Sequence, residues 1–241
     1  MKVLIITGGS KGIGKAIATK YALENWTVFT IARSTTNSTQ YTELTADLSD
    51  PTQAAVVLNT IFSQIQSEKI SEITLINNAG SLGKIAVLEN ISTEVLTKTM
   101  QLNSIAPLLL SSQFIHCTKN WTCTKQLINI SSGAANNPYA GWATYCTSKA
   151  GLDMMTRTIA AEQQAAENGV CCVSIHPGVV ATQMQENIRK TSEKDFKDVQ
   201  RFIDLHENNQ LYTPEFVANK LFELATKAQL NNGEIIDLRN L

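Results

Sequence analysis

The chain has 241 residues, of which 43% are hydrophobic and 17% charged, a composition that fits one α/β domain of the larger kind or two small ones. Twenty basic against twenty-one acidic residues leave a net charge of -1, so we expect no nucleic acid and no membrane as partners. No apolar stretch is long enough for a signal peptide or a membrane-spanning helix. The five cysteines form an odd set without a CxxC spacing, which is typical of free thiols in a soluble, cytoplasmic protein.

Short apolar runs alternate with helical patterns along the chain. The first run, Met1–Thr7, ends in glycines and is followed by apolar residues at near-helical spacing up to Leu23. Asp50-Pro51 then supplies an N-cap and a proline at the first position of a second helix. Only thirteen residues separate Arg33 from Asp47. Because this is short for a full helix between two strands, we expect a loop crossover there.

The remaining elements continue this alternation. The further predicted strands are Thr27–Ala32, Ile73–Ile76, Leu127–Ile130, Val170–Ile175 and Ile235–Leu238, and the further helical patterns lie around residues 93–119, 143–167 and 213–229. Strands that alternate with helices favour a parallel sheet. We therefore predict the α/β class, with one doubly wound parallel sheet of about seven strands, helices on both faces, and a single domain over residues 1–241.

A polar, charged stretch at about residues 183–212 breaks the rhythm of strands and helices. It follows the strand Val170–Ile175, and ligands of open parallel sheets bind beyond the carboxyl ends of the strands. Long insertions in compact domains tend to be functional. We therefore predict a substrate lid, with an ordinary solvated helical excursion as the alternative.

A glycine-rich loop, Thr7–Gly14, follows the first strand and opens the first helix. Glycines let the backbone approach a pyrophosphate closely, and free N–H groups at the helix start favour the anion. The alternative is a turn that merely needs a positive φ at glycine, but the position between a strand and a helix favours dinucleotide binding. The predicted contacts of this loop are Gly8, Ser10, Lys11, Gly12, Ile13 and Gly14.

The end of the second strand indicates which nicotinamide cofactor is bound. An acidic residue there would accept hydrogen bonds from a free adenosine ribose, but the chain has Ala32-Arg33-Ser34. Arg33 and Lys11 together would supply two cations for a 2'-phosphate. We therefore predict NADPH and NADP+ as the cofactor pair, with two ordinary surface cations as the alternative.

Three polar residues in the middle of the chain form a catalytic pattern. Tyr145 and Lys149 are four residues apart on one helical face, and Ser132 follows the strand Leu127–Ile130. The motifs found in order with them are the glycine-rich loop, Asn77–Gly80, Leu102-Asn103 and Pro177-Gly178. On these residues the chain resembles the short-chain dehydrogenase/reductase family over essentially its whole length. The resemblance implies a Rossmann-type fold.

The resemblance also implies catalytic roles. Ser132 would hold the substrate carbonyl oxygen, and Tyr145 would donate its proton. Lys149 would lower the tyrosine pKa and bind the nicotinamide ribose, while Asn103 would complete a proton relay. A tyrosine with an ordinary pKa of about 10 is a poor acid–base group at neutral pH until a cation stabilises its phenolate.

Further cofactor contacts follow from the same resemblance. The residues implied are Asn78, Ala79 and Gly80 along the cofactor, Asp47 and Leu48 beside its adenine, Pro177, Gly178, Val180 and Thr182 over its nicotinamide, and Tyr145 with Lys149 at the ribose.

Within the family, the segments Asn77–Gly83 and Gly141–Cys146 are similar to sepiapterin reductases. The segments Ile128–Ala150 and Pro177–Leu205 are more similar to bacterial benzil reductases. Both groups reduce one carbonyl of a vicinal dicarbonyl with NADPH. We therefore predict an NADPH-dependent carbonyl reductase that acts on a small-molecule carbonyl substrate.

Two alternatives stay open. In a sepiapterin reductase, Asp237 would anchor the pterin, although it is equally interpretable as a structural residue of the last strand. A redox sensor would bind NADPH without turnover, since a fold does not fix a function. Intact Ser132, Tyr145 and Lys149 argue against the sensor.

Other residues complete the prediction. Trp142 would line the substrate pocket, or else pack in the core of its loop.

His116, His176 and His206 have no partners at metal-ligand spacing, so we expect structural or solvated histidines and no metal. The helices around residues 103–119 and 143–167 have broad apolar faces, and such helices form the dimer contact in relatives. We expect a homodimer or homotetramer.

Overall fold

One parallel sheet organises residues 1–227 and 230–241, the part of the chain that the computed structural model describes. Within these residues seven strands pair in the order β3-β2-β1-β4-β5-β6-β7, which confirms the predicted sheet. The strands are β1 (Lys2–Thr7), β2 (Thr27–Ala32), β3 (Thr42–Thr45), β4 (Glu72–Asn77), β5 (Thr124–Ile130), β6 (Cys171–His176) and β7 (Ile235–Asp237). Because the order reverses beside β1, the sheet is doubly wound, and the carboxyl ends of β1 and β4 are where ligands of such sheets bind.

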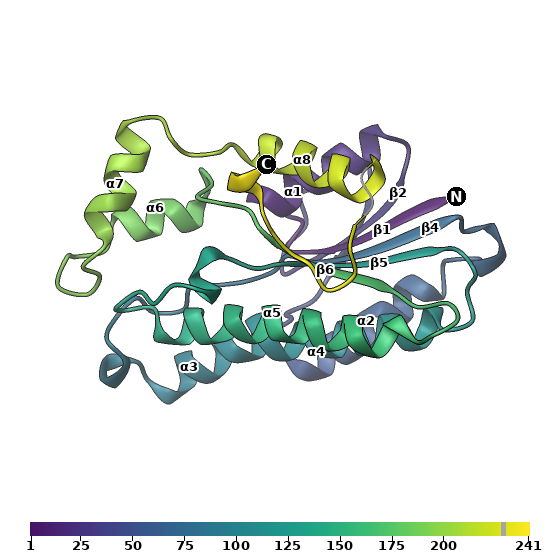
Figure 1. Ribbon diagram of the computed structural model, residues 1–241, viewed down its shortest axis with the longest axis horizontal. Coiled ribbons are helices and arrows are strands. Elements are labelled where there is room, and N and C mark those ends of the chain that lie inside the picture. Colours follow the sequence, from purple (N-terminus) through teal and green to yellow (C-terminus); the bar gives the residue numbers. More distant parts are fainter. Residues whose placement is uncertain (228–229) are drawn as a thin grey trace.

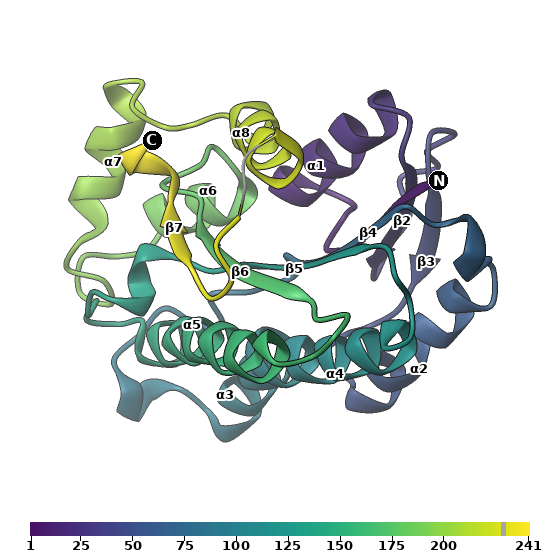
Figure 2. The same cartoon turned by 45° about the vertical axis from the view of Figure 1, so that its right-hand side comes forward.

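Helices cover both faces of the sheet, as predicted (Figure 1). The described helices are α1 (Gly12–Leu23), α2 (Pro51–Phe62), α3 (Thr93–Met100), α4 (Ala106–Thr118), α5 (Ala143–Gln164), α6 (Gln183–Arg189), α7 (Val199–Glu207) and α8 (Pro214–Lys227). Helices α2, α4 and α5 lie on one face, and α1 and α8 lie together on the other (Figure 2). Strands β1, β2, β4, β5 and β6 are buried on both faces, which is why they are largely apolar in sequence. None of the described helices combines the length and apolar character of a membrane span.

Local sequence signals set several element boundaries. Asp50 caps α2 by accepting a hydrogen bond from the Thr52 amide at 2.9 Å, with Pro51 at the first helical position. No helix lies between β2 and β3, so the predicted loop crossover is confirmed. The five cysteines are free, as predicted.

The predicted helical pattern over residues 93–119 is not one helix. Helix α3 ends at Met100, a π-helical turn, η3 (Gln101–Ile105), follows, and α4 begins at Ala106. Pro107 explains the break, because its ring lacks an N–H and is tolerated only in the first turn of a helix. The turn places Asn103 inside the fold rather than on a regular helix face.

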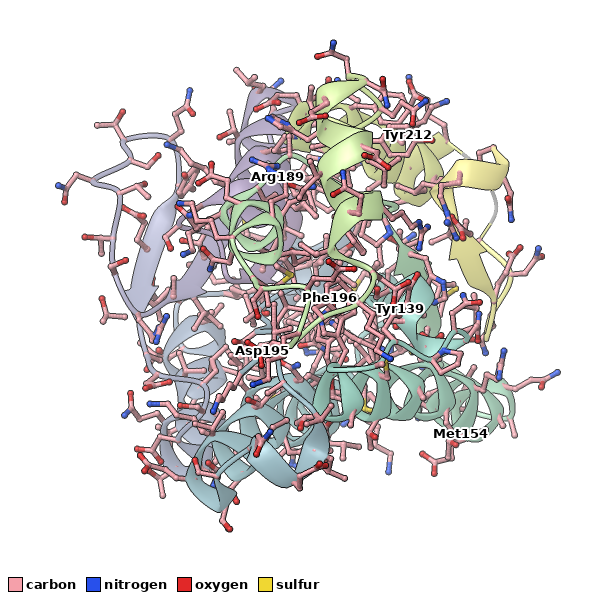
Figure 3. All side chains as sticks on the ribbon, turned by 90° about the vertical axis from the view of Figure 1, so that its left-hand side faces the viewer. Tyr139, Met154, Arg189, Asp195, Phe196 and Tyr212 are labelled. Atoms are coloured by element: carbon pink, nitrogen blue, oxygen red, sulfur yellow. The ribbon has the colours of Figure 1, made fainter. Side chains whose placement is uncertain are left out.

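The segment 183–212 carries α6 and α7 and lies at the carboxyl end of the sheet (Figures 1 and 3). Its fully buried Phe196 stacks on Trp142, with 4.6 Å between ring centroids and 6° between ring planes. Phe202 of α7 joins the same cluster. This segment is therefore packed against the loop before α5 and is not merely a solvated excursion.

Candidate active site

The glycine-rich loop between β1 and α1 has the backbone that a pyrophosphate site requires. Gly8 and Gly12 have φ values of +71° and +54°, which only glycine adopts without strain. A Cβ on Gly14 would overlap the carbonyl oxygen of Gly8. Lys11, the N-cap of α1, makes no side-chain cap hydrogen bond, so the first N–H groups of the helix remain available to an anion.

The carboxyl ends of β1 and β4 are tied together beside this loop. The Thr7 hydroxyl accepts hydrogen bonds from the amides of Asn78 and Ala79, both at 2.9 Å. The Asn78 side chain in turn donates to the Thr7 carbonyl at 2.9 Å. The structure therefore brings the predicted Asn78–Gly80 segment to the edge of the glycine-rich loop, where the residues fit a dinucleotide.

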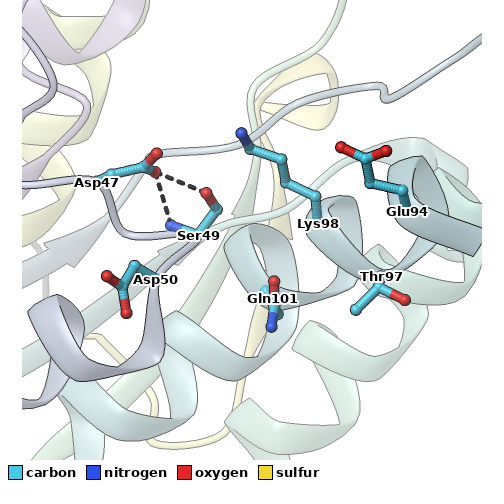
Figure 4. A pocket seen from close by; sticks show the side chains of 7 residues that line it. All are labelled: Asp47, Ser49, Asp50, Glu94, Thr97, Lys98 and Gln101. Carbon is cyan, nitrogen blue, oxygen red and sulfur yellow. Dashed lines mark hydrogen bonds between the residues drawn. The ribbon is translucent and has the colours of Figure 1, made fainter.

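The predicted adenine end is an open, polar hollow of about 460 Å³. Asp47 lines it, with Lys98 and Glu94 of α3 on the other side (Figure 4). Hydrogen bonds from the hydroxyl and amide of Ser49, at 2.7 and 3.0 Å, lower the pKa of Asp47, and the charges of Lys98 and Arg33 lower it further. Arg33 itself is exposed at the end of β2. Leu48 is buried in the hydrophobic core.

Ser132, Tyr145 and Lys149 converge at the carboxyl end of β5. Ser132 caps a short turn directly after the strand by accepting a hydrogen bond from the Ala134 amide at 3.2 Å, and it lies close enough to Tyr145 to lower the pKa of that hydroxyl. Tyr145 and Lys149 lie on the inward face of α5, where the lysine Nζ is 5.7 Å from the centroid of the tyrosine ring. The same Nζ donates to the Ile130 carbonyl at 2.8 Å. Three residues from two elements thus surround one point.

Burial controls the pKa values of this cluster. Desolvation raises the pKa of Tyr145 to about 12, although the hydrogen bond with Ser132 opposes the shift. Desolvation also lowers the pKa of Lys149 to about 8, against the effect of the Asp153 charge. In the protein alone the pKa of Tyr145 is raised rather than lowered, because burial outweighs the effect of Ser132, and the expected effect of Lys149 on this pKa stays a prediction. The tyrosine is therefore protonated at neutral pH.

Asn103 lies beside this cluster but has no free side-chain group. Its amide donates to the Ser81 carbonyl at 2.8 Å and to the Ser148 hydroxyl at 3.0 Å, and its oxygen accepts from the Ser81 amide at 2.9 Å. A Cβ on Gly80 would lie 3.5 Å from the Asn103 oxygen and 3.6 Å from the Lys149 Nζ. The side chain therefore holds the loop after β4 against α5, and its part in a relay stays a prediction.

Pro177, Gly178, Val180 and Thr182 follow β6 and reach the glycine-rich loop. A Cβ on Gly12 would lie 3.4 Å from the Thr182 methyl group. Gly178 has a φ of +78° and lies under the ring of Tyr212. The segment thus crosses the crevice from β6 to the start of α1, as a contact over a nicotinamide requires.

Trp142, predicted to line the substrate pocket or to pack its loop, is packed in a buried aromatic cluster. Its ring is 5% exposed, stacks on Phe196 and meets the Tyr145 ring edge-on, with 5.7 Å between centroids. The structure thus shows the core packing, and a contact with the substrate stays a prediction.

Asp237 ends β7 with its carboxylate already engaged. Arg239 Nε donates to both carboxylate oxygens, at 2.9 and 3.1 Å, and its Nη2 also contacts Oδ2. This hydrogen bonding lowers the pKa of Asp237. A pterin would have to displace the guanidinium, so its predicted anchor stays untested.

Comparison with known proteins agrees with this geometry. The family model described as short chain dehydrogenase matches residues 2–193, which include the glycine-rich loop, Ser132, Tyr145 and Lys149. The chain is a short-chain dehydrogenase. It is therefore an oxidoreductase that acts on carbonyl or hydroxyl groups, in a family that uses NAD(H) or NADP(H).

Individual relatives cover nearly the whole of this short-chain dehydrogenase. Two benzil reductases that form (S)-benzoin, from Bacillus subtilis (strain 168) and Bacillus cereus, are 42% and 40% identical to it, over 99% and 98% of both chains. The sepiapterin reductase of Meriones unguiculatus is 29% identical over 98% of the chain and 95% of its own length. The solved structure of the KRED1-Pglu enzyme matches with a TM-score of 0.84 at 27% identity, over 98% of this chain and 100% of the other.

The histidines of the short-chain dehydrogenase have separate places. His116 and His206 are exposed on α4 and α7, whereas His176 is buried at the end of β6. No cluster of three or more His, Cys, Asp or Glu side chains within residues 1–227 and 230–241 could hold a metal ion.

A buried network below Lys149 was not found by the sequence analysis. Asp153 Oδ2 lies 2.8 Å from His176 Nε2, and Asp153 Oδ1 accepts from the Ser174 hydroxyl at 2.7 Å. Asp153 and His176 are 4% and 2% exposed. The available signal was spacing, because Asp153 follows Lys149 by four residues on the same face of α5. The network fixes α5 to the end of β6.

This network leads to a prediction on pH. Carbonyl reduction should decline as the pH rises through about 8, because Lys149 loses its proton there. Asp153→Asn should move this decline to lower pH, since the carboxylate charge raises the lysine pKa and the amide retains much of the shape. The measurement is kcat/KM across the neutral and alkaline range. A decline at the same pH in both proteins would contradict the assignment.

Proposed function

We propose that this short-chain dehydrogenase is an NADPH-dependent carbonyl reductase that transfers hydride to one carbonyl of a vicinal dicarbonyl. The observation that carries the proposal is the likeness to two benzil reductases over almost the full length, together with the convergence of Ser132, Tyr145 and Lys149. A nicotinamide cofactor supplies the hydride when bound. The residues of this chain supply orientation, the proton and the electrostatics.

The catalytic cluster performs three tasks in the proposed reaction. Ser132 and Tyr145 hydrogen-bond the substrate carbonyl oxygen and orient it. Tyr145, with its pKa raised to about 12 by burial, is protonated at neutral pH and gives its proton to that oxygen as the carbonyl carbon is reduced. Lys149 holds a positive charge beside the phenolate that remains, and stabilises it in a buried site.

The preference for NADPH rests on charge at the adenine end. Arg33 directly follows β2, at the place where an acidic residue would bind a free ribose. Lys11 is the N-cap of α1, in the loop that follows the neighbouring strand β1. Both cations are exposed, so they can reach a 2'-phosphate without losing existing salt bridges. The guanidinium adds a bidentate pairing with phosphate.

A sepiapterin reductase is the second candidate, supported by relatives at lower identity. A sepiapterin reductase would need the Asp237 carboxylate to bind the pterin, but that carboxylate is already hydrogen-bonded to Arg239. This pairing favours the dicarbonyl substrate.

Three further properties belong to the same proposal. Residues 183–212 form a lid that closes over the substrate, supported by the packing of Phe196 on Trp142. The chain forms a homodimer or homotetramer, supported by Leu108 and Met154, which are exposed on α4 and α5. The enzyme works in the cytoplasm, supported by its five free cysteines.

The substrate class is tested with matched ketones. Purified enzyme and NADPH are mixed with 1-phenylpropane-1,2-dione or with propiophenone, which lacks the second carbonyl, and cofactor oxidation is followed by absorbance. We expect the dione to be reduced with a kcat/KM at least tenfold higher, on the order of one charged hydrogen bond. Equal values for both ketones, or reduction of sepiapterin in preference to the dione, would contradict the proposal.

A further inference from the structure

Arg239 reaches the substrate side of the catalytic cluster from the carboxyl terminus. It lies in a short turn, η5 (Leu238–Asn240), directly after β7. A Cβ on Gly133 would lie 3.5 Å from its Nη2, and a Cβ on Gly178 would lie 3.4 Å from its Cγ. Gly133 follows Ser132 in the chain, and Gly178 belongs to the segment after β6. The guanidinium therefore lies between the loop that carries Ser132 and the loop that covers the nicotinamide.

The guanidinium has unused hydrogen-bond donors at this position. Its contacts with Asp237 involve Nε and Nη2, whereas Nη1 makes no hydrogen bond to any residue in the described part of the chain. An arginine carries five N–H donors. The side chain is 46% exposed, so these free donors are accessible to a ligand from solvent. Asp237 fixes the direction in which they point.

The surroundings of Arg239 favour a ligand group that accepts hydrogen bonds over one that donates them. Tyr139 and Tyr212 lie within electrostatic range of the guanidinium, and both are labelled in the view onto this end of the sheet in Figure 3. A second arginine, Arg201 of α7, donates from Nη1 to the Tyr139 hydroxyl at 2.9 Å. Two guanidinium groups thus lie near Tyr139, and a guanidinium attracts substrate oxygens that carry negative or partial negative charge.

We infer that Arg239 is the specificity-determining residue for carbonyl substrates that bear a second oxygen acceptor next to the reacting carbonyl. Ser132 and Tyr145 take the oxygen of the reacting carbonyl, and the free donors of Arg239 take the neighbouring carbonyl or carboxylate oxygen. Asp237 is then a positioning residue for Arg239 and does not bind the substrate. The inference rests on the proposed function, because the reacting carbonyl must lie at Ser132 and Tyr145.

The substrates that follow from this arrangement are vicinal diketones and 2-oxo acids. Both place an acceptor oxygen one bond away from the reacting carbonyl carbon. A 2-oxo acid adds a full negative charge, which strengthens a hydrogen bond from a guanidinium. A simple ketone offers no second acceptor, so its binding gains nothing from the guanidinium.

The test compares three substrates in wild type and variants. Arg239→Leu should lower kcat/KM roughly 10- to 100-fold for 1-phenylpropane-1,2-dione, and at least as much for phenylglyoxylate, as expected for one lost charged hydrogen bond. Propiophenone should change little. Arg239→Lys keeps the charge without the planar fork and should restore part of the loss. Asp237→Asn should raise KM for the dione while leaving kcat and the propiophenone values near wild type.

Controls separate this inference from the proposed function. Lys119→Leu removes an exposed cation after α4, at the opposite end of the sheet, and should leave all three substrates unchanged. Equal losses on the dione and propiophenone in Arg239→Leu, or no loss on either, would overturn the inference alone. A wild-type enzyme that does not reduce the dione would overturn the proposed function, and the inference with it.

Discussion

Replacing Tyr145 by phenylalanine should lower the turnover of carbonyl reduction by roughly 100- to 10,000-fold, the range in which a positioned acid contributes. The variant keeps the ring that packs edge-on against Trp142 and loses only the hydroxyl. Lys149 keeps its hydrogen bond to the Ile130 carbonyl, so the binding of NADPH should stay near wild type. Turnover is measured with saturating dione, and cofactor binding is titrated separately through nicotinamide fluorescence.

A matched variant shows whether the loss is specific. Tyr41→Phe removes the hydroxyl of another buried tyrosine, which precedes β3 and lies outside the catalytic cluster. It should retain wild-type turnover. Near wild-type activity in Tyr145→Phe, or equal losses in the two variants, would show that the assigned proton donor is wrong.

Charge reversal at Arg33 should raise the Michaelis constant for NADPH by about 100-fold or more, because it removes a charged hydrogen bond and places a carboxylate near the 2'-phosphate. The constant for NADH should change far less, since its ribose has no such phosphate. Arg33→Asp should therefore convert a preference for NADPH into a preference for NADH. Initial rates with each cofactor at saturating dione give both constants.

The control for this prediction is Lys69→Asp. Lys69 is an exposed cation just before β4, at the amino end of the sheet, and its reversal should leave both constants unchanged. Equal use of the two cofactors by the wild type would contradict the role of Arg33, as would an unchanged preference in Arg33→Asp.

The fold was predictable because its signals are local. Strands buried on both faces produce apolar runs such as Leu127–Ile130, and parallel pairing follows from the helices between them. The break between α3 and α4 was not predicted, although Pro107 was visible in the sequence. A proline in a helical pattern is compatible with the first turn of a new helix as well as with a kink, and only the packing around Asn103 decides between the two.

In the candidate site, too, the contacts set by local spacing were predictable and the contacts between distant segments were not. Tyr145 and Lys149 are one helical turn apart, so spacing alone placed them together. The contacts of Asp153 with His176, and of Arg239 with the loop after Ser132, join segments that are far apart in the chain. No periodicity predicts such contacts. The direction of the Tyr145 pKa was also beyond the sequence, because it depends on how much water the folded protein removes from the hydroxyl.

Transfer of a deuterium label tests the central claim most directly. NADPH that carries deuterium at the transferable position is incubated with the enzyme and 1-phenylpropane-1,2-dione, and the product is analysed by mass spectrometry and nuclear magnetic resonance. The account predicts a hydroxyketone with a single deuterium on the carbinol carbon, next to an unreduced carbonyl. A product without deuterium, a fully reduced diol as the first product, or no product at all would contradict it.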